Sequence, residues 1–88
     1  MQIKHSAGFK RAYKARVQKN QELKELFWEA VEIFEHDPFH ASLRTHKLTG
    51  PMEGKWAFSV AYDCRVVFHF ISESDVVFLD IGSHDEVY

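Results

Sequence analysis

This 88-residue sequence lacks paired cysteines, long apolar runs and internal repeats. Because Cys64 is the only cysteine, no disulfide can form within the chain, and because no signal-like apolar segment stands at its start, we expect a reducing, cytoplasmic location. No apolar run approaches the ~18 residues of a membrane-spanning helix, so we expect no membrane partner. Without a linker or a low-complexity stretch, residues 1–88 are expected to form one domain.

Each end of the chain lacks charged residues of one sign, acidic ones at the start and basic ones at the end. Residues 1–19 contain no acid, and residues 66–88 contain no lysine or arginine. One interpretation is an ordinary set of solvated faces. The other is a basic surface for an anionic partner, built from the first helix and the middle segment. A pI near 6.3 is not typical of a simple nonspecific nucleic-acid binder, which is usually basic throughout.

The first half of the sequence predicts a short strand and two helices. Alternation in residues 1–6 favours an edge strand, and Ser6 is a residue type that caps helices. Apolar residues then recur at helical spacing over residues 9–17 and 23–34, the second time opposite a row of glutamates. Asn20 either breaks the first helix or caps the second, and Asp37 ends the second because a residue before proline avoids helical geometry. We expect an antiparallel pair of helices packed on a sheet.

The second half changes to alternating periodicity, which predicts four more strands. They are expected at residues 42–48, 56–62, 65–71 and 76–81, with a turn at 49–55 and a tight connection at Asp63 and Cys64. The last strand is almost continuously apolar, as a central strand buried on both faces would be. The expected fold is α+β, in the order β-α-α-β-β-β-β, with an antiparallel-rich sheet packed against a helical hairpin.

Polar groups with useful chemistry gather at strand ends and turns: His46, Lys47, Asp63, Arg65, His84 and Tyr88. A histidine exchanges a proton near neutral pH, an arginine binds phosphate through two hydrogen bonds, and a tyrosine contacts phosphate or, at a lowered pKa, acts as a base. To cleave RNA without a metal, a site must take a proton from the 2′-hydroxyl, give one to the 5′-oxygen and stabilise the phosphoryl charge. These groups could meet all three requirements. The sequence leaves open whether Arg65 and His84 lie at the same end of the sheet.

Structural explanations compete with these assignments. Four histidines are interpreted as surface or structural residues: His5, His36, His40 and His69. A zinc site from His36, His40 and His46 would lack the short Cys/His pairings of structural zinc motifs, and we expect neither a metal nor another cofactor. Arg65 could simply pair with a neighbouring acid. Trp28, on the rim of its helix's apolar stripe, either packs partly or contacts a partner protein.

Two blocks of the sequence resemble the RelE/ParE superfamily of bacterial type II toxins. The segment LRTHKLTGPMEGKWAFSVAYDCRVVFHF resembles the middle of that family, where an h-L-x-G turn leads to a strand ending in D-x-R-h-x-F/Y. The segment LDIGSHDEVY resembles its ending, a strand followed by G-x-H-x-x-h-Y/F. The resemblance covers essentially the whole chain. It is strongest to the YafQ-like and StbE-like group, whose members are ribosome-dependent mRNA endonucleases.

The resemblance implies roles for single residues. His84 matches a histidine that donates or accepts a proton in cleavage, and Tyr88 a terminal aromatic residue that contacts the nucleotide at the cut. Arg65 matches an arginine on the scissile phosphate, His46 the histidine before the L-x-G turn, and Asp63 the aspartate before the next strand. Further RNA-binding residues are expected among the basic ones: Lys47, Lys10, Arg11, Lys14 and Arg44. The implied partners are a cognate antitoxin protein, the ribosome with its mRNA, and 16S ribosomal RNA contacted by the basic first helix.

Two positions depart from the YafQ-like pattern and keep other functions open. Asp80 stands where such members often carry an arginine, and Ser59 where they carry a histidine. The leading interpretation is an mRNA interferase that cleaves the codon in the ribosomal A site. A ParE-like inhibitor of DNA gyrase would share the fold and need no catalytic histidine. A degenerate, non-toxic family member would account for both departures.

Overall fold

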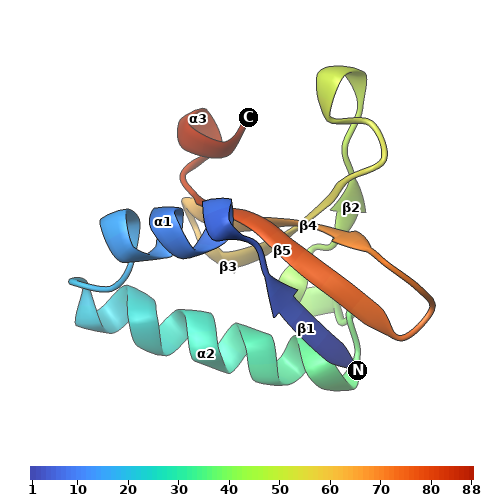
Figure 1. The fold of residues 1–88 in the computed structure, drawn as a ribbon. Coiled ribbons are helices and arrows are strands. Elements are labelled where there is room, and N and C mark those ends of the chain that lie inside the picture. Colours follow the sequence, from blue (N-terminus) through green and yellow to red (C-terminus); the bar gives the residue numbers. More distant parts are fainter.

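The segments with alternating periodicity, together with the first strand, form a five-stranded sheet in the computed structural model, which describes residues 1–88 (Figure 1). The strands are β1 (Gln2–His5), β2 (His46–Lys47), β3 (Trp56–Ala61), β4 (Cys64–Phe70) and β5 (Asp75–Gly82). They lie in the order β1-β5-β4-β3-β2, with β1 parallel to β5 and all other neighbours antiparallel. The expected α+β fold and element order are confirmed, with β1 as an edge strand.

Side-chain caps fix where the two long helices begin. The Phe9 N–H donates to Ser6 Oγ at 3.0 Å at the start of α1 (Ala7–Arg16). The Leu23 N–H donates to Asn20 Oδ1 at 3.0 Å at the start of α2 (Gln21–His36), so Asn20 caps the second helix. Asp37 ends α2, as expected.

The structure adds short helical elements that were not among those expected. They are α3 (His84–Val87) and two 3-10 helices, η1 (Ala41–Leu43) and η2 (Gly50–Met52). Figure 1 shows α2 on one side of the sheet and α3 on the opposite side. None of the helices is both long enough and apolar enough to span a membrane.

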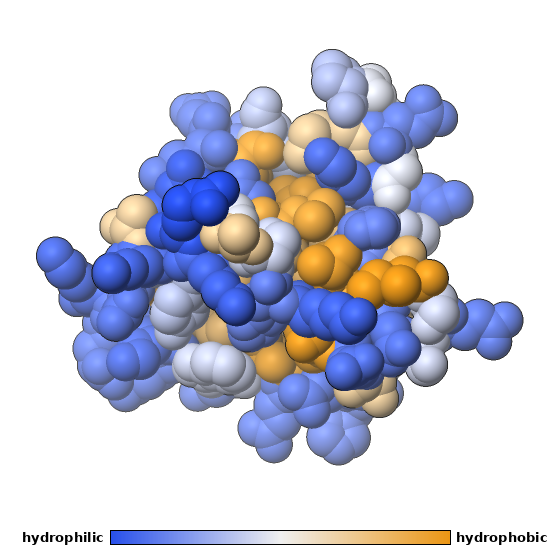
Figure 2. All heavy atoms as spheres, in the orientation of Figure 1, coloured by the Kyte–Doolittle hydropathy of each residue, from blue (hydrophilic) through white to orange (hydrophobic).

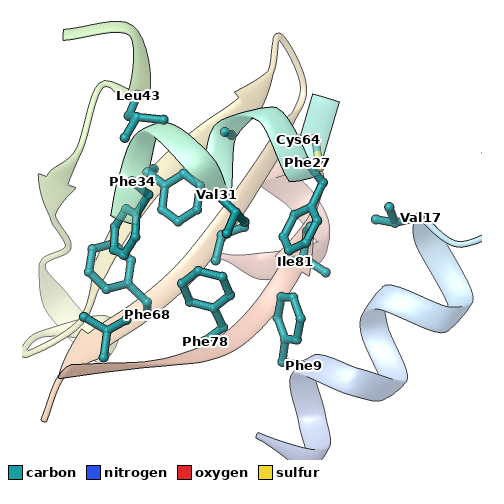
Figure 3. Close-up of a cluster of buried hydrophobic side chains, with 14 of the residues drawn as sticks. Phe9, Val17, Phe27, Val31, Phe34, Leu43, Cys64, Phe68, Phe78 and Ile81 are labelled. Atoms are coloured by element: carbon teal, nitrogen blue, oxygen red, sulfur yellow. The ribbon is translucent and has the colours of Figure 1, made fainter. Parts of the chain in front are cut away.

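Phenylalanine side chains fill the space between the helical hairpin and one face of the sheet (Figure 3). The most deeply buried are Phe9, Phe27, Phe34, Phe58, Phe68 and Phe78. The ring of Phe34 on α2 lies 4.8 Å from that of Phe58 and 5.0 Å from that of Phe68, centroid to centroid. Fully burying one such side chain contributes about 1.5–3 kcal/mol. This cluster therefore holds both long helices on one face and leaves most of the other face free of them.

The strand expected at residues 42–48 is much shorter than its alternation indicated. Only His46 and Lys47 pair with β3, while residues 41–43 form η1. The cause is local. The Ser42 N–H donates to His40 Nδ1 at 3.2 Å, and Arg44 adopts a left-handed conformation with φ of 51°. A residue at positive φ interrupts an extended strand.

The connection between β3 and β4 also lies one residue earlier than expected. Tyr62 and Asp63 form the turn, and Cys64 already belongs to β4. The pairing register shifts between Ser59 and Ala61, which is the signature of a bulge. Strict alternation from Trp56 would place Tyr62 on the apolar face with Phe58, but after the bulge its side chain is fully exposed.

β5 was expected to be buried on both faces, and this expectation is wrong. Val76 and Phe78 are buried against the helices, whereas Val77 and Leu79 stay partly exposed. The reason is that α1 and α2 cover the same face of the sheet. Figure 2 shows the consequence as apolar atoms gathered in the middle of the surface, over β5, with hydrophilic residues around them.

Candidate functional site

Strand register places the candidate residues of the sheet on the face opposite α1 and α2. Ser59 of β3 pairs with Arg65 of β4, and Arg65 pairs with Gly82 at the end of β5. Directly paired residues point to the same face, so this row leads to α3, which starts two residues after Gly82. His46 of β2 pairs with Ala57, which shares the face of Ser59 because the two are two residues apart.

A hollow of about 700 Å³ opens between this row, the β3–β4 turn and the start of α3. Most residues expected to be catalytic line it: His46, Asp63, Arg65 and His84. Arg44, expected to bind RNA, lines it as well. The His84 side chain is 63 % exposed and that of Arg65 26 %, so both are accessible to a ligand. The two groups whose relative placement the sequence left open therefore face one space.

Asp63 connects the β3–β4 turn to the start of α3. Its Oδ1 lies 3.8 Å from Arg65 Nη1 and accepts a hydrogen bond from the His84 N–H at 3.4 Å. Both contacts are long and the carboxylate is exposed, so we expect them to add little to stability. Their effect is on position, because they keep the Arg65 guanidinium and the His84 backbone at one edge of the hollow.

The backbone sets the tautomer of His46. Its Nδ1 lies 2.9 Å from the carbonyl oxygen of Arg44. A carbonyl only accepts hydrogen bonds, so Nδ1 carries the proton, and in the neutral ring Nε2 is left unprotonated. An imidazole held in this way can accept a proton through Nε2, which is the requirement for a general base.

Tyr88, the last residue, lies against His84. The two rings meet edge to face with their centroids 4.7 Å apart. Partial burial raises the pKa of the Tyr88 hydroxyl, and the positive charge of Arg65 offsets part of this rise. The hydroxyl is therefore protonated at neutral pH. Of the two roles considered for a tyrosine, a hydrogen bond to phosphate and action as a base, the raised pKa favours the first.

The remaining residues expected to bind RNA lie outside the hollow. Lys47 pairs with Trp56 on the other face of the sheet, and its Nζ lies 5.4 Å from the centre of the Trp56 ring. Lys10, Arg11 and Lys14 are exposed on α1. Any contact of these three with RNA would use a surface separate from the hollow.

Two residues that were not expected in the site, Ser42 and Tyr62, also line the hollow. Ser59, one of the two departures from the YafQ-like pattern, lies in its wall beside Arg65. The position of Ser42 depends on η1, for which alternation gave no signal. Tyr62 could have been included in the site because it directly precedes Asp63 in the turn between β3 and β4.

The histidines set aside in the sequence lie elsewhere. His36 and His40 line a separate depression at the end of α2, without His46. No group of three or more His, Cys, Asp or Glu side chains is arranged to hold a metal ion.

Comparisons with known proteins agree with this architecture. The model of one protein family, described as a bacterial toxin of type II toxin-antitoxin system, YafQ, matches residues 1–88. YafQ from E. coli superposes with a TM-score of 0.81 at 17 % identity, covering 98 % of this chain and 96 % of that one. A YoeB/ParE toxin from Agrobacterium tumefaciens gives a TM-score of 0.79 at 15 % identity, covering 96 % and 99 %.

A chain of the E. coli DinJ-YafQ complex gives a TM-score of 0.71 at 18 % identity, covering 98 % of this chain and 96 % of that one. No curated protein matches the sequence significantly. At these identities the structural likeness shows a shared fold and no more. The family match spans the whole chain and agrees with the resemblance seen in the sequence: this protein belongs to the YafQ family of bacterial toxins of type II toxin-antitoxin systems.

Proposed function

We propose that this protein is the toxin of a type II toxin-antitoxin pair and cleaves mRNA in the A site of the ribosome. The observation that carries the proposal is the hollow in which His46, Arg65 and His84 face one space, with Arg44 in its wall. Cleavage of a phosphodiester by its own 2′-hydroxyl requires a proton acceptor, a proton donor and positive charge. Two imidazoles and two guanidiniums supply these groups.

In the proposed reaction, Nε2 of His46 takes the proton of the ribose 2′-hydroxyl, since its Nδ1 proton is held by the Arg44 carbonyl. The 2′-oxygen attacks the adjacent phosphorus, and the bond between phosphorus and the 5′-oxygen breaks. A protonated His84 gives its proton to that leaving oxygen. The products are a 2′,3′-cyclic phosphate and a 5′-hydroxyl, and the balanced reaction calls for no metal or cofactor.

Arg65 and Arg44 stabilise the negative charge that grows on the phosphoryl oxygens. The Asp63 carboxylate holds the Arg65 guanidinium at the edge of the hollow. Tyr88 and the fully exposed Tyr62 offer aromatic surfaces to the nucleotides on either side of the cut. Lys47 is left out of this step because it lies on the other face of the sheet.

The partners that fit the proposal are a cognate antitoxin, the ribosome and its mRNA. The family's description as part of a toxin-antitoxin system supports an antitoxin, as does the DinJ-YafQ complex among the similar structures. Lys10, Arg11 and Lys14 on α1 would bind phosphates of the 16S ribosomal RNA. These partners imply action in the cytoplasm.

Ser59 favours a second candidate, a family member without nuclease activity. It stands beside Arg65 in the hollow, where YafQ-like members carry a histidine, and a serine hydroxyl does not change its charge near neutral pH as an imidazole does. Such a protein would inhibit DNA gyrase, as ParE does, or have no toxicity. An arrest of DNA synthesis without mRNA cleavage would indicate the first, and normal growth without an antitoxin the second.

The proposal is tested by programming purified ribosomes with a defined mRNA, adding the protein and mapping cuts by primer extension. We expect a cut in phase with the codon in the A site, only when ribosomes are present. His84→Ala and His46→Ala should each slow it by ~10²–10⁴-fold, the usual contribution of a general acid or base. His36→Ala, which removes an exposed histidine of α2, should leave the rate unchanged. No cut by the unaltered protein, or a cut that survives His84→Ala, would overturn the proposal.

A further inference from the structure

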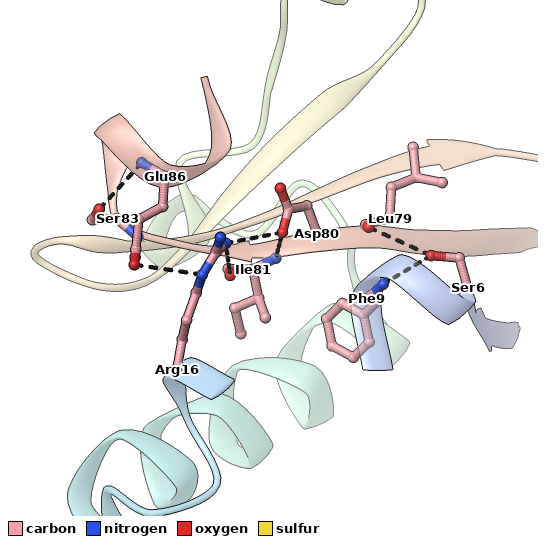
Figure 4. A network of polar contacts seen from close by, with 8 residues as sticks. All are labelled: Ser6, Phe9, Arg16, Leu79, Asp80, Ile81, Ser83 and Glu86. Atoms are coloured by element: carbon pink, nitrogen blue, oxygen red, sulfur yellow. Dashed lines mark hydrogen bonds and ion pairs between the residues drawn. The ribbon is translucent and has the colours of Figure 1, made fainter. Parts of the chain in front are cut away.

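Arg16, the last residue of α1, differs from the other basic residues of that helix. Lys10, Arg11 and Lys14 are exposed and form no ion pair, whereas Arg16 is only partly exposed and forms two. Figure 4 shows its side chain reaching across to the end of β5 and to α3. Although Arg16 belongs to the basic first helix, it therefore connects α1 to β5 and α3 and is not a freely solvated residue.

One guanidinium joins three elements. Arg16 Nη1 donates to Asp80 Oδ1 at 3.2 Å and to the Ile81 carbonyl oxygen at 3.0 Å, both on β5. Its Nε lies 3.4 Å from Oε2 of Glu86 on α3. The Asp80 carboxylate is fixed in turn, because its Oδ1 also accepts from the Ile81 N–H at 2.9 Å. Arginine suits this position because its planar guanidinium holds donors on separate nitrogen atoms, here Nη1 and Nε, whereas the three donors of a lysine ammonium share one nitrogen.

α3 depends on contacts of this kind because so short a helix is not stable alone. A capping box closes it internally: the Ser83 N–H donates to Glu86 Oε1 at 2.7 Å, and the Glu86 N–H donates to Ser83 Oγ at 3.3 Å. Glu86 thus uses one carboxylate oxygen within α3 and the other for Arg16. The hydrogen bonds with Ser83, together with the charge of Arg16, lower the pKa of Glu86 and keep it ionised at neutral pH.

Gly82 leaves room for the same contact. A Cβ at this position would lie 2.8 Å from Glu86 Oε1 and 2.9 Å from Arg16 Nη1, which is too close for either group to stay in place. The glycine therefore lets the guanidinium and the carboxylate meet against the backbone at the end of β5.

We propose that Arg16 is a positioning residue, which anchors α3 on the end of β5 and thereby holds His84 and Tyr88 at the hollow. Arg16 does not line the hollow, and its guanidinium, shared by Asp80 and Glu86, is not available to a phosphate. Its effect on the reaction must pass through α3, which carries His84 at its first position. The consequence for cleavage rests on the proposed function, whereas the anchoring of α3 does not.

The anchoring is tested by NMR spectroscopy of the full chain in solution. The edge-to-face contact of His84 and Tyr88 should give a nuclear Overhauser effect between their ring protons and a ring-current shift of the His84 signals. Arg16→Ala should abolish both signals, and Arg16→Lys, which keeps the charge and loses the fork, should restore them only in part. Arg11→Ala removes an exposed charge from the same helix and should leave both signals intact. If both signals persist in Arg16→Ala, the anchor does not exist.

Should Arg16→Ala fail to fold, Glu86→Gln removes only the ionic end of the contact on α3 and must weaken the same two signals. An unchanged NMR signature in Glu86→Gln would then overturn the proposal.

The link to catalysis is tested in the ribosome assay. We expect kcat of Arg16→Ala to fall about tenfold or more with KM nearly unchanged, because the lost property is the placement of His84 and not the binding of RNA. Full activity in a variant that has lost the ring contact would overturn the link to catalysis. If the unaltered protein does not cut at all, the proposed function fails, and the NMR result still decides whether Arg16 anchors α3.

Discussion

Cys64 opens β4, next to Asp63 and Arg65 of the hollow, and only 3 % of its surface is exposed. Burial raises the pKa of its thiol to about 11, and the carboxylates of Glu86 and Asp63 add to the rise, whereas Arg65 lowers it. The reactive form of cysteine is the thiolate. We therefore expect Cys64 to be a packing residue that takes no part in the chemistry of its neighbours.

Ellman's reagent at pH 8 tests this expectation. Cys64 should react ~100-fold more slowly in the folded protein than in protein unfolded by guanidinium, because a pKa of about 11 leaves only about one thiol in a thousand ionised at that pH. The rate in the folded protein should rise with pH up to about 11. Equal rates in the folded and unfolded protein would show that the thiol is neither buried nor shifted.

The residues of the site could be predicted to different degrees. His46, Arg65 and His84 could be singled out because their side chains have distinctive chemistry and lie beside strand ends. Arg16 could not, because its partner Asp80 lies 64 positions further along the chain, and a lone arginine among other basic residues of a helix is usually solvated. Partner identity is a property of the fold, so sequence patterns within one helix do not reveal it.

Among the elements, α2 followed most closely from the sequence. Its apolar stripe, the cap at Asn20 and the end at Asp37 are all local features. The strand expected at residues 42–48 failed because the left-handed conformation of Arg44 leaves no mark in the alternation of side chains. α3 had a local signal that was not used, the S-x-x-E spacing of Ser83 and Glu86 that forms its capping box.

Removing the cap of α2 tests how far this element depends on its first turn. Asn20→Ala should lower the free energy of unfolding by about 1 kcal/mol, because the Leu23 N–H loses its acceptor. For a domain of this size, that loss corresponds to a Tm lower by roughly 4–8 °C, measurable by circular dichroism. Asn20→Ser keeps an acceptor and should melt near the unaltered protein. If the alanine and serine variants melt together, the side-chain cap contributes nothing.

At the scale of the whole molecule, the sheet order creates the site. His46 comes from β2, Arg65 from β4 and His84 from α3, and only the order β2-β3-β4-β5 gathers them on one face. The order of elements could be predicted from periodicity. The parallel pairing of β1 with β5 could not, because it joins segments at opposite ends of the chain whose alternation fits several neighbours.

If the hollow cleaves mRNA through the message's own 2′-hydroxyl, as we propose, removing that hydroxyl must prevent the cut. The most direct measurement compares two messages on the same ribosomes, one unmodified and one with a single 2′-deoxynucleotide on the 5′ side of the mapped cut. We expect a cut in the unmodified message that leaves a 2′,3′-cyclic phosphate and a 5′-hydroxyl, and no cut at the deoxynucleotide. Equal cutting of both messages, or no cutting of either, would contradict it.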